Sequence, residues 1–295
     1  LYKSIYGNKV IFEEINHDLG LVFRYQWNSG KVFGFVKKAE LINTSDTGYR
    51  ITLLDGIQNI LPYGVPSALQ ATTSNLVDAY KRSELEPASG VGIYALSAII
   101  VDKAEPSEAL KANIAWSLGL ENPVYLLSSG QLEKFRQRQP AQEERDIKGE
   151  KGAYLVSTEI LLAGNSDKKW AIVANVNQNH SQIISLCRSI QENNDLGKQL
   201  QEDIDAGTQN LIQLVASADG LQFSSDKLND TRHFSNVLFN IMRGGIFDDN
   251  YQVEKEDFVR YLYKANRGVV AGNQDFIGRL PEVFPLLELN NRLLQ

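Results

Sequence analysis

The sequence predicts an α+β protein with an antiparallel β-sandwich over residues 1–178 and a helical region over residues 179–295. Two observations predict the sandwich. Apolar and polar residues alternate along most segments before residue 178, and turn signals separate these segments at the short spacing of an all-β fold. A third observation predicts the helices, because apolar residues after residue 178 recur every three to four positions.

Roughly eight to ten strands are expected in the first part, as in a typical sandwich. The clearest is 21–27, where Leu21, Phe23, Tyr25 and Trp27 share one face. The expected strands cover residues 10–15, 21–27, 32–42, 49–54, 91–101, 110–118, 124–127, 154–162 and 170–176. We expect a short exposed helix or loop at 131–139, and a solvated edge or hairpin arm at 140–151.

The stretch from Leu53 to Pro66 is expected to be an angular loop tied to the core by its apolar residues. Asp55-Gly56 is a turn signal, and further prolines and glycines follow. Pro66-Ser67 then opens an expected helix that carries Leu69, Thr73, Leu76 and Tyr80 at helical spacing.

Helix signals organise the second part of the chain. Asn179 or Ser181 is positioned to cap a first helix, and a second pattern runs from Leu196 to Ala218. Ser225 or Asp226 starts a third helix, which Gly244-Gly245 ends. Residues 257–263 fit either a helix or a strand, whereas 275–280 and 282–294 favour helices.

Composition excludes several classes of function. The chain is 43% hydrophobic and 22% charged with a net charge of -6, and no basic cluster with interleaved aromatics appears. This argues against nucleic acid or an anionic membrane surface as a partner. No apolar run approaches the roughly 20 residues of a membrane span. The chain begins without Met, so we expect a piece of a longer protein; a cytoplasmic location is expected, although a removed signal peptide would leave no trace.

The histidines, the single cysteine and the aspartate cluster show no sequence pattern typical of a metal site or a catalytic nucleophile. His17, His180 and His233 lack a metal-ligand spacing, so surface or capping roles are favoured for them. The single cysteine, Cys187, lies on an apolar helical stripe, where an inert thiol is expected and no intrachain disulfide can form. Asp248-Asp249-Asn250 offers oxygen ligands, but a solvated loop explains it better than calcium. No metal and no cofactor are predicted.

Carbohydrate binding is the chemistry for which the sequence offers candidate residues, although a purely structural role for them is favoured. Flat aromatic rings complement the C–H face of a pyranose, whereas amides and carboxylates bind its hydroxyls. Tyr63 lies between a proline and a glycine, and with Asp55, Gln58 and Asn59 it forms a candidate polar lip. Trp116 and Trp170 lie on apolar faces and are expected in the core. A glycosidase would need two carboxylates across a bond, and nothing in the sequence pairs any.

Four segments resemble a known family: LDGIQNILPYG (Leu54–Gly64), SAIIVDK (Ser97–Lys103), ADGLQ (Ala218–Gln222) and RHFSNVLFNIMRGG (Arg232–Gly245). They are similar to the N-terminal region of large bacterial proteins akin to cellobiose phosphorylases, the glycoside hydrolase family 94 type. The resemblance implies a β-supersandwich like that of galactose mutarotase, followed by linker helices that lead to a catalytic (α/α)6 barrel. It places the catalytic acid and phosphate-binding residues in the barrel, so it implies none here.

The resemblance therefore favours a non-catalytic module of a carbohydrate-active enzyme. Its expected partners are the barrel of the same parent chain and carbohydrate, and self-association as a homodimer stays open. Two alternatives remain. A mutarotase-like epimerase would need a His and a Glu in the sandwich cleft, and neither His17 nor any Glu here aligns with that motif. A carbohydrate-binding module would use Tyr63.

Overall fold

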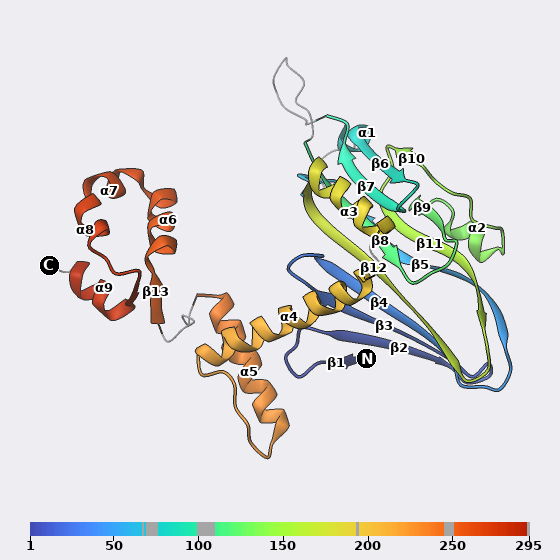
Figure 1. The fold of residues 1–295 in the computed structure, drawn as a ribbon, viewed down its shortest axis with the longest axis horizontal. Coiled ribbons are helices and arrows are strands. Elements are labelled where there is room, and N and C mark those ends of the chain that lie inside the picture. The colour runs from blue at the N-terminus through green and yellow to red at the C-terminus, as the bar shows by residue number, and fades with distance from the viewer. Residues whose placement is uncertain (67, 69–75, 99–109, 193–194, 245–250, 294–295) are drawn as a thin grey trace. The chain divides into compact units, whose positions relative to one another are not determined.

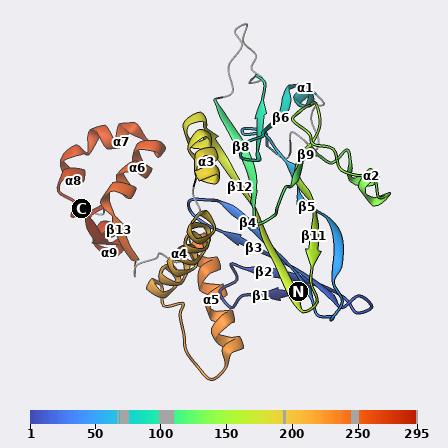
Figure 2. The ribbon, with the colours of Figure 1, turned by 45° about the vertical axis from the view of Figure 1, so that its right-hand side comes forward.

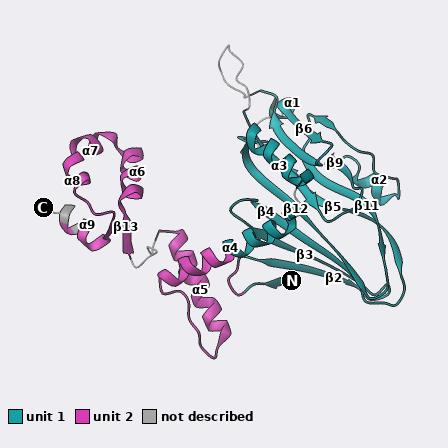
Figure 3. Cartoon of the chain, viewed as in Figure 1, with its two compact units in different colours: residues 1–4, 8–207 teal, residues 5–7, 208–295 magenta. Residues whose placement is uncertain are grey.

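The computed structural model describes residues 1–66, 68, 76–98, 110–192, 195–244 and 251–293 (Figure 1). The chain divides into two units, one of residues 1–4 and 8–207 and the other of residues 5–7 and 208–295 (Figure 3). The first strand-rich part ends at Asn179, and the helix α3 (His180–Glu192) follows directly. The predicted α+β class, an antiparallel sandwich followed by a helical region, is confirmed.

The first unit contains two sheets, and every strand pair described in them is antiparallel. The nine-stranded sheet consists, in spatial order, of β1 (Tyr2–Lys3), β2 (Val10–Asn16), β3 (Leu21–Ser29), β4 (Phe35–Asn43), β12 (Ser166–Asn179), β8 (Lys111–Leu118), β7 (Val91–Leu96), β6 (Lys81–Glu86) and β10 (Asp146–Lys148). The three-stranded sheet consists of β5 (Tyr49–Ile60), β11 (Gly152–Leu162) and β9 (Val124–Ser128).

The main core lies between the two sheets. Because side chains alternate along a strand, each strand of the nine-stranded sheet sends every second residue to this inner face. Ala39, Tyr94 and Trp170 meet Leu127 and Tyr154 of the smaller sheet there, and each is almost fully buried. The core position predicted for Trp170 is confirmed.

The helix α3 and the first turns of α4 (Leu196–Ser217) cover the outer face of the nine-stranded sheet, opposite the smaller sheet (Figure 2). Ile183 of α3 and Leu200 of α4 are buried there in one cluster with Ile114, Trp116 and Val173. Asn179 caps α3, since its side-chain oxygen accepts from the Gln182 N–H at 3.0 Å. The start of α4 is held by Asp203, whose carboxylate accepts from the backbone N–H groups of residues 31–33. Both helices therefore have fixed positions on this face.

The turn predicted at Asp55-Gly56 is wrong, because β5 continues through it to Ile60. Asp55 pairs with Val156, and Gly56 pairs with Leu155. A Cβ on Gly56 would lie 2.1 Å from the carbonyl oxygen of Tyr154, so glycine serves close approach to β11. Pairing with a distant strand outweighs the local turn signal.

Other differences concern a polar strand, the bounds of single elements and segments that lie outside the described residues. Strand β6 is missing from the predictions because Leu85 is its one apolar residue, and β4 begins at Phe35 where 32–42 was predicted. The short helix predicted within 131–139 is confirmed as α2 (Leu132–Arg136). Of the helix predicted from Pro66, the structure describes α1 (Leu76–Tyr80), and Leu69 and Thr73 lie outside the described residues. The end of the strand predicted over 91–101 and the Asp248–Asn250 cluster also lie outside them.

The second unit has two small cores. In the first, α5 (Lys227–Met242) buries Phe234 and Val237 against Val215. As predicted, Asp226 caps α5 by accepting from the Leu228 and Asn229 N–H groups.

In the second core, the strands β13 (Gln252–Glu254) and β14 (Val283–Pro285) pair antiparallel, and Leu280, Phe284 and Leu289 are buried. The helices of this part are α6 (Lys255–Ala265), α7 (Arg267–Gly272), α8 (Gln274–Gly278) and α9 (Leu286–Leu293). Residues 257–263, which fitted either state, are helical, and the helix predicted over 275–280 corresponds to α8. The helix predicted over 282–294 begins only at Leu286, because residues 283–285 form β14, where Pro285 favours extended backbone in the residue before it. Strand β13 and helix α7 had no clear sequence signal.

Candidate functional site

Three of the four predicted site residues lie at the end of β5 or, for Tyr63, just after it. Gln58 and Asn59 are exposed, and Asn59 has a left-handed backbone with φ 59°. Tyr63 is 40% exposed, and the Lys111 ammonium lies 5.4 Å from the centroid of its ring. Ser129 donates a 3.2 Å hydrogen bond to the side-chain oxygen of Gln58. An exposed ring, two amides and a cation thus lie in this region.

Asp55 does not join this exposed group. Its side chain is 10% exposed and forms an ion pair with Lys37 of β4, which is 8% exposed. The second carboxylate oxygen accepts a 2.8 Å hydrogen bond from the Trp170 indole N–H. Lys37 also donates to the Gly56 carbonyl at 3.3 Å and lies 5.0 Å from the centroid of the Tyr25 ring. Both oxygens of Asp55 are engaged, so it acts as a buried link between the two sheets.

Aromatic rings extend this network along the inner face. Phe12 stacks on Tyr25 with the ring centroids 4.8 Å apart, and Phe23 stacks on Trp170 at 6.0 Å. Phe12 is 37% exposed, and Phe35, which alternation places on the same face as Lys37, is 56% exposed. The sequence analysis did not identify Phe12, Phe35 or Lys37 as candidate site residues, because their shared face depends on the pairing of β2, β3 and β4.

Two buried phenols complete the inner face. The Tyr94 hydroxyl donates to the Ala153 carbonyl at 2.7 Å, and the Tyr154 hydroxyl donates to the Gly90 carbonyl at 2.7 Å. Burial raises the pKa of both hydroxyls well above their ordinary value. These tyrosines are neutral hydrogen-bond donors and are not poised to give up protons near neutral pH.

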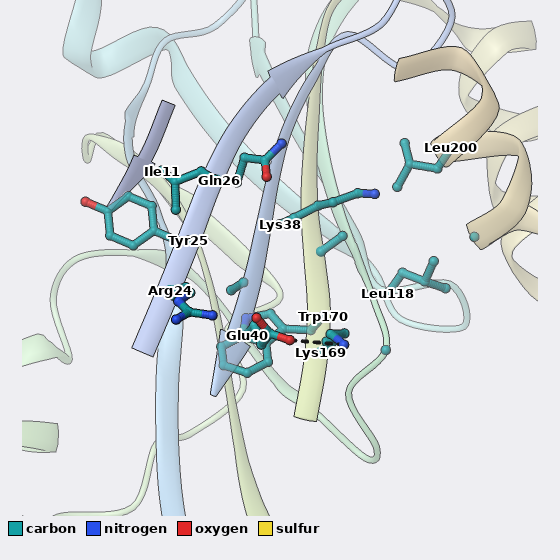
Figure 4. Close-up of a pocket in the computed structure, with 14 residues that line it drawn as sticks. Ile11, Arg24, Tyr25, Gln26, Lys38, Glu40, Leu118, Lys169, Trp170 and Leu200 are labelled. Atoms are coloured by element: carbon teal, nitrogen blue, oxygen red, sulfur yellow. Dashed lines mark ion pairs between the residues drawn. The ribbon is translucent and has the colours of Figure 1, made fainter. Parts of the chain in front are cut away.

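The outer face holds a pocket of about 540 Å³, between the sheet and the first turns of α4 (Figure 4). Its polar and charged residues come from neighbouring strands, and its apolar wall includes Leu118 and Leu200. Further lining residues are Ile11, Arg24, Gln26, Lys38, Glu40, Lys169, Ala171 and Gly197. A pocket of this size is within the range that takes small molecules.

The cations of this pocket differ in how they are neutralised. Lys169 lies 3.0 Å from a Glu40 oxygen and 3.1 Å from an Asp167 oxygen, and Arg24 forms an ion pair with Glu13. Lys38 instead donates to the neutral side-chain oxygen of Gln201. Burial lowers the pKa of the Lys38 ammonium, and the nearby charge of Asp205 opposes this effect.

The three histidines lie apart from one another in the chain and are placed as follows. His17 lies in the turn between β2 and β3, His180 is the exposed first residue of α3, and His233 contacts the Asp219 carbonyl at 2.9 Å. None of the three forms an ion pair with a carboxylate in the described part of the chain. The described residues also hold no group of three side chains suited to a metal ion.

Residues 247–295 match the family described as glycoside hydrolase family 149 insertion domain 1. This segment includes β13, β14 and the helices α6 to α9 of the second unit. The match relates this segment to carbohydrate-active enzymes of the glycoside hydrolase kind. No curated protein matches the sequence. None of the described helices combines the length and apolar character needed to cross a membrane.

Two solved structures give weak likenesses. One, described as "Putative kojibiose phosphorylase from human microbiome", is 9% identical with a TM-score of 0.26, covering 80% of this chain and 23% of that one. The other, the family GH92 alpha-mannosidase from Bacteroides thetaiotaomicron, is 6% identical with a TM-score of 0.35, covering 85% of this chain and 34% of that one. TM-scores this low do not establish a shared fold. The chain spans about a third or less of the length of either structure.

Proposed function

We propose that the chain is a non-catalytic module of a carbohydrate-active enzyme of the glycoside phosphorylase or hydrolase kind, related to the cellobiose phosphorylases. The observation that carries the proposal is the match of residues 247–295 to an insertion domain of glycoside hydrolase family 149. The module would pack against a catalytic (α/α)6 barrel of its parent chain and contribute to carbohydrate binding.

Activity assays test the non-catalytic part. We expect the chain alone to release neither sugar nor sugar phosphate from cellobiose and related disaccharides, with or without inorganic phosphate. Clear turnover would overturn the proposal. So would mutarotation of glucose or galactose measured by polarimetry and lost in His17→Ala, which would instead establish the epimerase function.

Carbohydrate contact is proposed at the end of β5. Tyr63 offers an exposed ring there, and Gln58 and Asn59 offer amides for sugar hydroxyls. Calorimetric titration with cello-oligosaccharides should give saturable binding that Tyr63→Ala weakens at least tenfold. Tyr261→Ala removes a ring that is 68% exposed in the other unit and is the matched control. Binding that both variants retain, or no binding at all, would refute this contact.

Docking against another domain is supported by apolar side chains that the second unit exposes. Phe223 is 81% exposed, Met242 is 70% exposed and Phe239 is 51% exposed. Phe239 and Met242 are three positions apart on α5 and so lie on the same side of this helix. Contiguous exposed apolar surface marks interaction sites, and a lone module that carries it should self-associate. Light scattering should show a mass above that of the monomer at high concentration, and Met242→Lys should lower it. A strict monomer at all concentrations would contradict this part of the proposal.

A further inference from the structure

The outer-face pocket contains two rows of cross-strand neighbours with different charge balance. One row runs Glu13, Arg24, Glu40 and Lys169 across four strands, with each residue paired in register to the next. Its charges alternate in sign, and the ion pairs Arg24–Glu13 and Lys169–Glu40 neutralise them. This row needs no further charge.

The neighbouring row has one charge and no counter-charge. It runs Ile11, Gln26, Lys38, Ala171 and Leu118 across five strands, again in register. Within the described residues, Lys38 forms no ion pair with a carboxylate.

Groups outside the row do not change this balance. Asp205, the nearest acidic influence on Lys38, accepts from the Gln201 amide at 2.7 Å and lies 3.7 Å from the Lys9 ammonium. The Lys38 ammonium is therefore a partly desolvated cation beside an apolar wall.

We propose that this pocket binds a small organic anion, with its carboxylate or phosphate on Lys38 and an apolar body against Leu118, Ala171 and Leu200. A partly buried cation favours an anionic group that reaches it, because opposite charges attract more strongly where water is excluded. The apolar wall favours a body such as a ring over a bare inorganic ion. This site is separate from the carbohydrate contact proposed at the end of β5.

NMR titration of the full chain with four probes tests the site. Benzoate and phenyl phosphate carry both an anionic group and a ring, benzyl alcohol carries the ring alone, and inorganic phosphate carries the charge alone. We expect the first two to bind saturably, to shift the amide signals of Gly119 and Gly197, and to raise the pKa of the Lys38 ammonium. Equal binding of benzyl alcohol, equal binding of inorganic phosphate, or no binding of either ring-bearing anion would overturn the proposal.

Variants separate Lys38 from the other cations. Lys38→Met should weaken benzoate binding at least tenfold, and Lys38→Arg should retain most of it. Lys169→Met is the matched control, because it removes a lysine of the same pocket from the self-neutralised row and should change the affinity less than twofold. Unchanged affinity in a folded Lys38→Met protein, or an equal loss in Lys169→Met, would overturn the assignment of Lys38.

Discussion

Lys37 and Lys38 are adjacent on β4, but they point to opposite faces of the nine-stranded sheet and have different partners there. Lys37 points to the inner face, where it pairs with the carboxylate of Asp55 inside the sandwich. Lys38 points to the outer face, where its partner is the neutral amide of Gln201. Both lie on β4, so the backbone offers them equivalent positions. The difference arises entirely from what the opposite layer supplies.

This comparison distinguishes a lysine whose charge is neutralised within the core from a lysine whose charge can bind a ligand. The Lys37–Asp55 pair is completed by the Trp170 indole and joins the two sheets, so both partners are engaged within the core. Lys38 is held in place by a group that does not cancel its charge. We therefore expect substitutions on the inner face to change stability, and substitutions around Lys38 to change binding.

The largest expected effect is that of Asp55→Ala. The variant leaves the Lys37 ammonium buried without its counter-charge and should lower the free energy of unfolding by about 3–5 kcal/mol. All three tryptophans, Trp27, Trp116 and Trp170, lie in the first unit, so their fluorescence during urea unfolding reports this unit. The double variant Lys37→Met/Asp55→Leu should recover most of the loss. A loss below about 1 kcal/mol for Asp55→Ala would remove the distinction between the faces.

Alkaline pH should destabilise the inner face next. The pKa values of Tyr94 and Tyr154 are raised by burial, so the folded chain keeps both protons where the unfolded chain loses them. Their contribution is complete below about pH 10 and is lost as pH rises further, by up to about 1.4 kcal/mol per pH unit for each tyrosine. Unfolding curves measured from about pH 9 to about pH 11, which brackets the ordinary tyrosine pKa of about 10, test this expectation. Tyr154→Phe should reduce the slope, and a stability independent of pH in this range would contradict it.

The sequence predicts those parts of the fold that depend on local periodicity. Strand 21–27 and helix 196–218 were found because alternation and helical spacing are visible within each segment. The Asp55-Gly56 turn was wrong because its competing partner, β11, lies far along the chain. Strand β6 was not predicted, because its inward-facing residues Lys81 and Ser83 are polar although they are buried.

The candidate sites were less predictable for a related reason. Tyr63, Gln58 and Asn59 are neighbours in sequence, so they could be grouped as one candidate, although Gln58 and Asn59 lie in β5 and not in the expected turn. The outer-face pocket depends on the register of β3, β4 and β12 and on the position of α4. No single segment of the sequence determines these features. Asp55 looked available in the sequence because nothing in it identifies Lys37 as the partner.

Asp203 anchors α4 to the outer face, and its loss should have an intermediate effect. Its carboxylate accepts from the Lys31, Val32 and Phe33 N–H groups at 3.0 to 3.1 Å. Asp203→Ala should cost about 2 kcal/mol by leaving these donors without their acceptor, and Asp203→Asn should cost less. The exposed Asp205 is the control, because Asp205→Ala removes a surface pair worth less than about 1 kcal/mol. Equal effects of the two alanine variants would show that the anchor does not matter.

The smallest expected change in stability is that of Lys38→Met, and it is the sharpest test of the comparison. Removing an ammonium that has no carboxylate partner leaves no buried counter-charge behind, while methionine keeps much of the apolar stem. The free energy of unfolding should stay within about 1 kcal/mol of the parent value or rise. Lys37→Met, one residue earlier, should lower the free energy of unfolding by clearly more than Lys38→Met does, because Asp55 then remains buried without its ion-pair partner. If urea unfolding followed by tryptophan fluorescence gave equal losses for the two variants, Lys38 would be a structural charge like Lys37, and the outer-face pocket would have no cation to offer a ligand.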